Sequence, residues 1–183
     1  MPAYQRLYDD VKYTINDINQ QFLLSTCRND ISENENTINS WQAINYCESI
    51  ISHETLMTLF WQSDIGWVNS LKDGMNLVAK EYIAAQNPDN PGVLLLSCYA
   101  GAAEQMQAAV IIDPHKPKSM IEGLSIALKM PLSERQSRYQ SLLQGLKQDN
   151  LQAWQQRFLE DLYDGEKRQT DNLKPAEVQM SDS

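Results

Sequence analysis

The chain has 183 residues, of which 42% are hydrophobic and 21% charged, as expected for a globular protein with a sizeable core. The net charge of −9 argues against nonspecific nucleic-acid binding and against attachment to an anionic membrane surface. It does not exclude a phosphate ligand, because a helix start with one or two local cations can hold one. No apolar run approaches the roughly 20 residues of a membrane span, and the first ten residues do not resemble a secretory signal.

The three cysteines are widely spaced and odd in number: Cys27, Cys47 and Cys98. They form no CxxC pair, and no histidine cluster accompanies them. This pattern predicts reduced thiols and a cytoplasmic location, with no metal site and no cofactor.

The N-terminal region is predicted to contain a helix, a loop and a short strand. Apolar residues recur every three or four positions from Tyr4 to Phe22, which predicts an amphipathic helix over residues 3–22. Residues 25–40 are rich in Asn, Ser and Glu and are expected to form a loop. A short strand is expected at residues 43–47.

The middle of the chain predicts helices alternating with buried strands. A helix is expected at residues 53–62 and a strand at 65–68, then turn residues 69–74 and a helix from Met75 to Gln86. A breaker cluster at 87–92 precedes two apolar runs, 93–96 and 109–112, that are typical of buried parallel strands.

The last third of the chain is expected to be helical. A helix is predicted at residues 117–129, a second from the capping-box pair Ser133 and Gln136, and a third over 151–162. Residues 164–183 are polar and charged with few apolar anchors, which predicts a disordered tail. Trp154 and Phe158 are expected to be core or interface residues.

Strands alternating with helices predict an α/β fold: a Rossmann-like parallel sheet of four strands, flanked by helices. Ligands bind such sheets outside the carboxyl ends of the strands. The loops 69–74 and 97–103 both lie at that edge, so they are expected to meet in one crevice. His53 and His115 belong to no triad pattern and are expected at surface or cap positions.

The stretch from Ser63 to Gln86 carries the best candidate for a binding site. A helix start leaves free N–H groups that favour an anion, and Asp73 lies in the turn before it. Glu81 lies about two helical turns further on, and its side chain leans back toward the helix start. Carboxylates that accept from hydroxyls, beside N–H groups that donate to phosphates, suit a nucleotide sugar. Alternatively, Asp73 is only a turn residue and Glu81 only a solvated helix residue.

Several motifs resemble trehalose-phosphate synthases, which are retaining glycosyltransferases built from two Rossmann-like halves. LKDGMNLVAKEYIAAQNPDNPGVLLLS is similar to their donor-site segment, and its core DGMNLVAKEY is long and specific. The likeness continues in YAGAAEQM, PLSER and DNLQAWQQRFLEDL, and upstream in PAYQRLYDDVKYTINDINQQF. It covers residues 2–163, with a gap near 24–39.

The resemblance implies transfer of glucose from UDP-glucose, or another nucleotide-glucose, to glucose-6-phosphate in trehalose biosynthesis. It places Asp73 at the hydroxyls of the donor glucose and Glu81 at the ribose hydroxyls. It places the N–H groups of Gly74, Met75 and Asn76 near the sugar, and those of Leu77 and Val78 near the diphosphate.

The resemblance also has departures that bear on activity. Lys72 stands where the family usually has Arg, which would weaken a bidentate contact. No segment matches the Arg and Lys that the family's donor site takes from the first strand and loop of this half, nor the acceptor-binding half. Residues 1–163 are therefore expected to form a partial C-terminal domain resembling the incomplete C-terminal half of a GT-B glycosyltransferase. No catalytic residue is assigned, and the chain by itself is expected to be inactive, with glucose-6-phosphate bound only if the missing half is supplied.

Two other functions stay open. The chain is alternatively a noncatalytic remnant or an interaction partner of a longer homologue or another protein, as a homo-oligomer or with a partner chain. A fragment of an enzyme similar to glucosylglycerol-phosphate synthase is the minor alternative.

Overall fold

The computed structural model describes residues 2–29 and 42–172, which belong to two units, Met1–Ile51 and Ser52–Ser183. The first unit contains helix α1 (Pro2–Asn29) and an extended segment over residues 42–50. The side-chain amide of Asn19 pairs with the main chain of Ile44 twice: Nδ2 donates to its carbonyl at 3.0 Å, and Oδ1 accepts from its N–H at 2.8 Å. Lys12 and Glu48 form an ion pair at 3.1 Å.

Two predictions for this unit are wrong. Helix α1 continues past Phe22 to Asn29, so the polar stretch does not become a loop at residue 25; residues 30–41 lie outside the described chain. The segment 43–47 is not a strand, because the main-chain groups of Ile44 bond to the side chain of Asn19 rather than to another strand.

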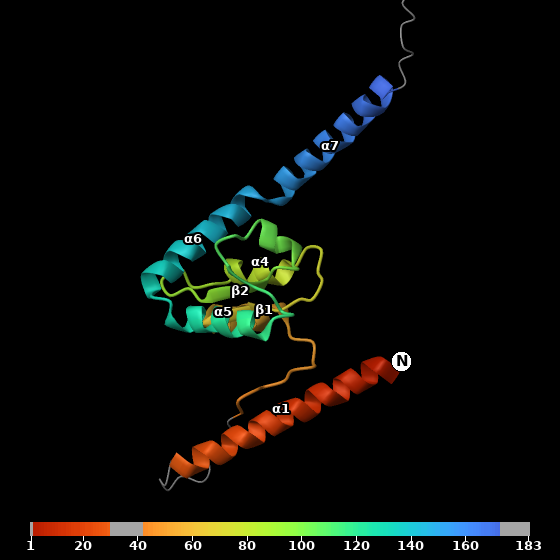
Figure 1. The fold of residues 1–183 in the computed structure, drawn as a ribbon. Coiled ribbons are helices and arrows are strands. Elements are labelled where there is room, and N and C mark those ends of the chain that lie inside the picture. The colour runs from red at the N-terminus through yellow and green to blue at the C-terminus, as the bar shows by residue number, and fades with distance from the viewer. Residues whose placement is uncertain (1, 30–41, 173–183) are drawn as a thin grey trace, which may run out of the picture. The chain divides into compact units, whose positions relative to one another are not determined.

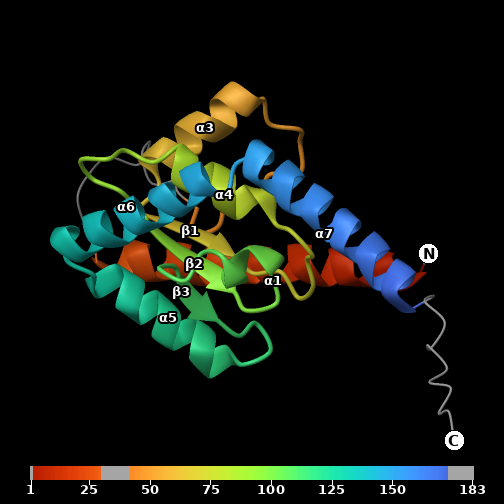
Figure 2. The same cartoon turned by 90° about the horizontal axis from the view of Figure 1, so that it is seen from above.

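The second unit is built on a parallel sheet in the order β1-β2-β3, which Figure 2 shows side by side. The strands are β1 (Ile65–Val68), β2 (Val93–Ser97) and β3 (Val110–Ile112). Trp67 is in register with Leu95, and Leu96 with Ile111. Among the described residues the sheet therefore has three strands rather than the predicted four, because the segment 43–47 does not contribute one.

Helices cover both faces of this sheet (Figure 1). One face packs against α4 (Leu77–Ala84), α6 (Leu132–Gln148) and the short 3-10 helix η1 (Gly101–Glu104), and the other against α5 (Pro117–Lys129). Helix α3 (His53–Gln62) packs against α4. The chain continues into α7 (Leu151–Asn172).

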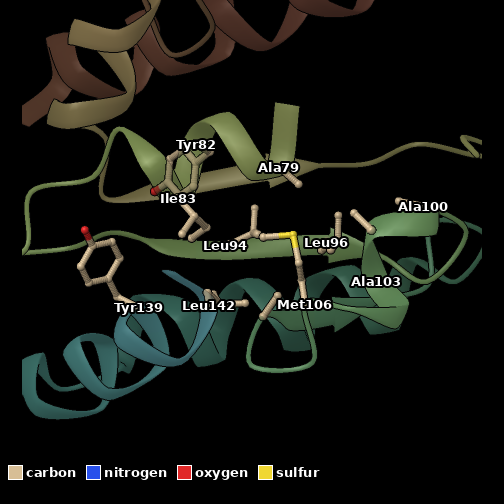
Figure 3. Packing of buried hydrophobic residues seen from close by; sticks show 12 residues of the cluster. Ala79, Tyr82, Ile83, Leu94, Leu96, Ala100, Ala103, Met106, Tyr139 and Leu142 are labelled. Carbon is tan, nitrogen blue, oxygen red and sulfur yellow. The ribbon is translucent and has the colours of Figure 1, made fainter. Parts of the chain in front are cut away.

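The central strand β2 is buried along its whole length, as its unbroken apolar run predicts. Leu94 and Leu96 face the layer of α4 and α6, whereas Val93 and Leu95 face α5. Figure 3 shows Ile83 of α4 and Met106 pointing toward Leu94 and Leu96. Fully burying each such leucine stabilises the fold by about 1.5–3 kcal/mol, so β2 fixes the layers that carry the loops at its end.

Helices α3 and α5 match their predicted bounds, whereas α4, α6 and α7 do not; α4 ends at Ala84 rather than Gln86. Helix α6 begins at Leu132 behind the extended Pro131, so Ser133 lies within the first turn and caps nothing. Helix α7 runs to Asn172, so residues 164–172 are helical instead of a disordered tail; residues 173–183 lie outside the described chain. Helix α4 begins at Leu77 rather than Met75, for a reason given below. None of the helices in the described ranges is long and apolar enough to cross a membrane.

Candidate functional site

The two loops that follow β1 and β2 are joined by main-chain hydrogen bonds at the carboxyl edge of the sheet. The N–H of Asp73 donates to the carbonyl of Tyr99 at 3.2 Å, and the N–H of Gly101 donates to the carbonyl of Asp73 at 2.8 Å. Asp73 and Ala100 thus form an isolated parallel bridge. The predicted meeting of the loops 69–74 and 97–103 is confirmed.

Gly101 permits this close approach. A Cβ atom at this position would collide with the carbonyl oxygen of Gly74. Any side chain here would push the two loops apart, so the glycine is required by the contact between them.

The carboxylate of Asp73 turns inward onto its own loop. Its Oδ1 accepts from the N–H groups of Met75 at 3.1 Å and Asn76 at 3.0 Å, and its Oδ2 accepts from Nδ2 of Asn76 at 2.8 Å. Hydrogen bonds to the charged form favour it. The Met75 N–H, followed by the Asn76 side chain, lowers the pKa of Asp73 below its usual value, so the carboxylate is ionised at neutral pH.

Asn76 starts helix α4. Its backbone is left-handed, with φ 60°, and its Oδ1 accepts from the N–H of Ala79 at 3.0 Å. Asparagine tolerates both the left-handed conformation and the N-cap position. This cap explains why α4 starts at Leu77, since Met75 belongs to the turn that Asp73 closes.

The structure divides the predicted N–H donors into two groups. Those of Met75 and Asn76 are bonded to Asp73, whereas those of Gly74, Leu77 and Val78 have no protein acceptor within the described ranges. The side chains of Leu77 and Val78 are 55% and 49% exposed, so solvent and ligands reach this end of α4. The helix start therefore keeps free donors that favour an anion.

Glu81 and Lys80 flank the buried face of α4, which is formed by Ala79, Tyr82 and Ile83. Glu81 is half-buried and makes no hydrogen bond to Asp73 or its loop in the described chain. Lys80 donates from Nζ to Oε1 of Gln105 at 2.9 Å, which ties α4 to the residue after η1. Lys72 is exposed.

Residues that support these two loops were not predicted from the sequence. Ser97 is fully buried at the end of β2, and its hydroxyl bonds to both loops. Tyr99 contacts His115 edge to face, with ring centroids 5.2 Å apart. A hydroxyl that ends a buried apolar run is the only sequence signal for Ser97, while His115 lies in an exposed position as expected.

Beyond His115, the loop after β3 pairs its own charges. Lys116 and Asp113 form an ion pair at 2.8 Å. This contact lowers the pKa of Asp113, together with the His115 N–H, and raises the pKa of Lys116. Lys116 is therefore already paired with Asp113, whereas the exposed Lys72 in the loop after β1 forms no ion pair within the described ranges.

The site can bind hydroxyls and an anion, and it holds no nucleophile paired with a base. Among the described residues no three His, Cys, Asp or Glu side chains gather as metal ligands. A groove of about 550 Å³ lies between α3 and α4, lined by Glu54, Met57, Thr58, Trp61, Ala84 and Ala85. That lining is mostly apolar, and Glu54 in the first turn of α3 adds a negative charge, so this groove suits a nucleotide sugar less well than the edge of the sheet.

The chain resembles known glycosyltransferases in sequence and in fold. The sequence profile of glycosyltransferase family 20 matches residues 1–164. The trehalose-6-phosphate synthase of Klebsiella pneumoniae is 46% identical over 122 residues, covering 67% of this chain and 26% of that protein.

Solved structures of trehalose-phosphate synthases share the fold. One from Burkholderia xenovorans, in complex with glucose-6-phosphate, superposes with a TM-score of 0.75 at 37% identity, covering 89% of this chain and 33% of that one. One from E. coli, bound with UDP-2-fluoro glucose, has a TM-score of 0.73 at 36% identity, covering 87% and 32%.

This chain thus spans about a quarter of the length of the curated relatives and a third of the solved ones. The profile match spans residues 1–164, a range that includes the sheet and both loops of the site. The chain belongs to glycosyltransferase family 20, the family of the trehalose-phosphate synthases.

Proposed function

We propose that the carboxyl edge of the sheet binds the donor nucleotide sugar, UDP-glucose, of a trehalose-phosphate synthase reaction. In that reaction glucose passes to glucose-6-phosphate. The observation that carries the proposal is the free N–H groups of Leu77 and Val78 at the start of α4, beside the ionised carboxylate of Asp73.

The diphosphate is assigned to the start of α4. Main-chain N–H groups of Leu77 and Val78 donate to its oxygens, and the helix dipole favours the negative charge there. Glu81, further along the same helix, accepts from the ribose hydroxyls. The free N–H of Gly74 is assigned to the sugar.

The glucose is assigned to Asp73. A carboxylate offers about four acceptor positions, and here Oδ1 already accepts two hydrogen bonds and Oδ2 one. Oδ2 therefore keeps one position for a sugar hydroxyl. The N–H groups of Met75 and Asn76 contact the sugar only if Oδ1 of Asp73 releases them.

The solved relatives support the choice of ligand. The E. coli structure that resembles this chain is bound with UDP-2-fluoro glucose, and a Burkholderia xenovorans structure contains glucose-6-phosphate. These observations favour a uridine diphosphate donor and glucose-6-phosphate as the acceptor of the complete reaction.

The chain alone is expected to bind UDP-glucose weakly. The resemblance assigns an Arg and a Lys of the family's donor site to a segment that these 183 residues do not match. Each charge-assisted contact contributes about 1.5–3 kcal/mol, so two such contacts correspond to a factor on the order of hundreds to tens of thousands. Millimolar affinity is expected.

Ligand-observed NMR with UDP and UDP-glucose tests the proposal. Glu81→Ala should weaken the signal of both ligands, because both carry the ribose. Asp73→Ala should weaken the signal of UDP-glucose but spare UDP. Glu122→Ala, on the opposite helix α5, is a matched control that should change neither. If the Asp73 and Glu81 variants bind both ligands like the parent chain, the assignment is wrong.

A second function is favoured by one observation on α7. Trp154 and Phe158 stack on each other at 5.4 Å but are 55% and 50% exposed. An apolar surface of this kind marks a contact site. The chain as an interaction partner, noncatalytic or joined to a longer homologue, is therefore the alternative proposal.

A further inference from the structure

A single buried hydroxyl joins the two loops of the proposed donor site. Ser97 ends β2 with 0% of its surface exposed. Its Oγ donates to the carbonyl of Ser70 at 2.6 Å and accepts from the N–H of Tyr99 at 3.1 Å. One atom thus bonds to the loop after β1 and to the loop after β2.

The network continues from Ser70 to the carboxylate of Asp73. Nδ2 of Asn76 donates one hydrogen to Oγ of Ser70 at 3.1 Å and the other to Oδ2 of Asp73 at 2.8 Å. Oδ1 of the same amide accepts from the N–H of Ala79. These three hydrogen bonds fix the orientation of the Asn76 amide. The oriented amide in turn fixes the position of Oδ2 of Asp73.

Capping of α4 does not require this arrangement. The cap needs only Oδ1 of Asn76, whereas the bonds to Ser70 and Asp73 use the opposite end of the amide. Ser97, in turn, occupies a fully buried strand position where an apolar residue would commonly stand. The polar side chains therefore restrict the carboxylate beyond what the helix start demands.

We propose that Ser97 is a positioning residue for the sugar part of the donor, acting through Ser70 and Asn76 on the carboxylate of Asp73. The proposal rests on the function proposed above, which assigns Asp73 to glucose. Ser97 is fully buried and does not itself touch the ligand. It sets Oδ2 of Asp73 where a glucose hydroxyl reaches it.

The test compares UDP and UDP-glucose binding by NMR titration of the full chain and its Ser97→Ala variant. Loss of the hydroxyl should raise the Kd of UDP-glucose about fivefold, as expected for one hydrogen bond, and the Kd of UDP less than about twofold. A general loss of structure would weaken both equally. Ser97→Thr keeps the hydroxyl and should restore the affinity for UDP-glucose.

Two controls sharpen the comparison. Ser119→Ala removes a hydroxyl in the first turn of α5, whose Oγ accepts from the N–H of Asp113, the residue after β3, at 3.0 Å; it should change neither Kd. In an Asp73→Ala background, Ser97→Ala should cause no further loss of UDP-glucose affinity, because its effect passes through that carboxylate. If Ser97→Ala fails to fold, Ser70→Ala removes the next link and should give the same difference between the two ligands.

The outcomes separate the two proposals. If the parent chain binds both ligands and Asp73→Ala weakens only UDP-glucose, but the Ser97 and Ser70 variants do not, the positioning role is refuted and the donor site stands. Equal weakening of both ligands also overturns the positioning role. A parent chain that binds neither ligand refutes the donor site and the positioning role together.

Discussion

Asp73 closes the turn before α4 and, in the proposed site, also faces the donor glucose. Its carboxylate accepts three hydrogen bonds from Met75 and Asn76. The sequence placed Asp73 in a turn beside a helix start, and that placement is confirmed. The three bonds could not be read from the sequence, because they depend on the left-handed backbone of Asn76, which a ten-residue motif does not reveal.

The hydrogen bonds of Asp73 predict a pH dependence of stability. The pKa of the folded carboxyl lies below its usual value of 3.8. A depressed pKa stabilises the fold above the pKa of the unfolded chain, and this contribution is lost as the pH falls through the folded value. Asp73→Asn should therefore lower the free energy of unfolding by the same amount at pH 7 and pH 5.5, and by less below pH 3.8.

Urea unfolding of the parent and the variant at each pH measures this difference. A stability difference that grows as the pH falls would contradict the sign. Glu122→Gln, at an exposed position on α5, is a control for the general effect of removing one negative charge.

At the scale of elements, the contact between the loops predicts opposite effects of two glycine substitutions. Gly101→Ala places a Cβ against the carbonyl of Gly74 and should destabilise the fold by about 1–3 kcal/mol. Gly145→Ala, in the helix α6, meets no atom within 4 Å and should stabilise it by about 0.5–1 kcal/mol. Thermal and urea unfolding measure both.

Comparing Gly101→Ala with Gly145→Ala separates a steric clash between the two loops from a general loss of stability on replacing a glycine. Equal destabilisation by both variants would contradict the close approach of the loops. Gly101→Ala should in addition weaken UDP-glucose binding, because its loop holds Asp73, whereas Gly145→Ala should not.

The elements themselves were predictable where local signals agree with the packing. The runs around Leu94 and Ile112 gave β2 and β3 within one residue, because buried strands are apolar throughout. The predictions of a strand at 43–47 and of a helix cap at Ser133 are wrong, because in the structure another residue makes the contact or starts the helix. The side chain of Asn19 bonds to the main-chain groups of Ile44. The extended Pro131 precedes α6, so the helix begins at Leu132, one residue before Ser133.

At the scale of the whole molecule, the chain carries a net charge of −9, although its proposed ligand contains a negatively charged diphosphate. The nearby cations Lys80 and Lys116 are paired with Gln105 and Asp113. Main-chain donors at α4 and the exposed Lys72 are therefore left to attract the diphosphate, which agrees with weak binding by the chain alone.

The exposed side of α7 predicts association. Leu151, Trp154, Phe158 and Leu162 are each at least half exposed, and their apolar surface should bind a hydrophobic dye and drive self-association at high concentration. The double substitution Trp154→Ala with Phe158→Ala should reduce both. Gln152→Ala, at an exposed position on the same helix, should change neither. Light scattering that shows a monomer at high concentration, without dye binding, would argue against this surface.

The carboxyl edge of the sheet is proposed to bind a nucleotide sugar. Titration of the isotope-labelled chain with UDP-glucose, followed by amide NMR signals, tests it at the level of residues. Binding at this edge should shift the signals of Gly74, Leu77, Val78 and the loop 97–103, and UDP alone should shift mainly Leu77 and Val78. Shifts confined to the groove between α3 and α4, around Met57 and Trp61, or no shifts at millimolar ligand, would contradict it.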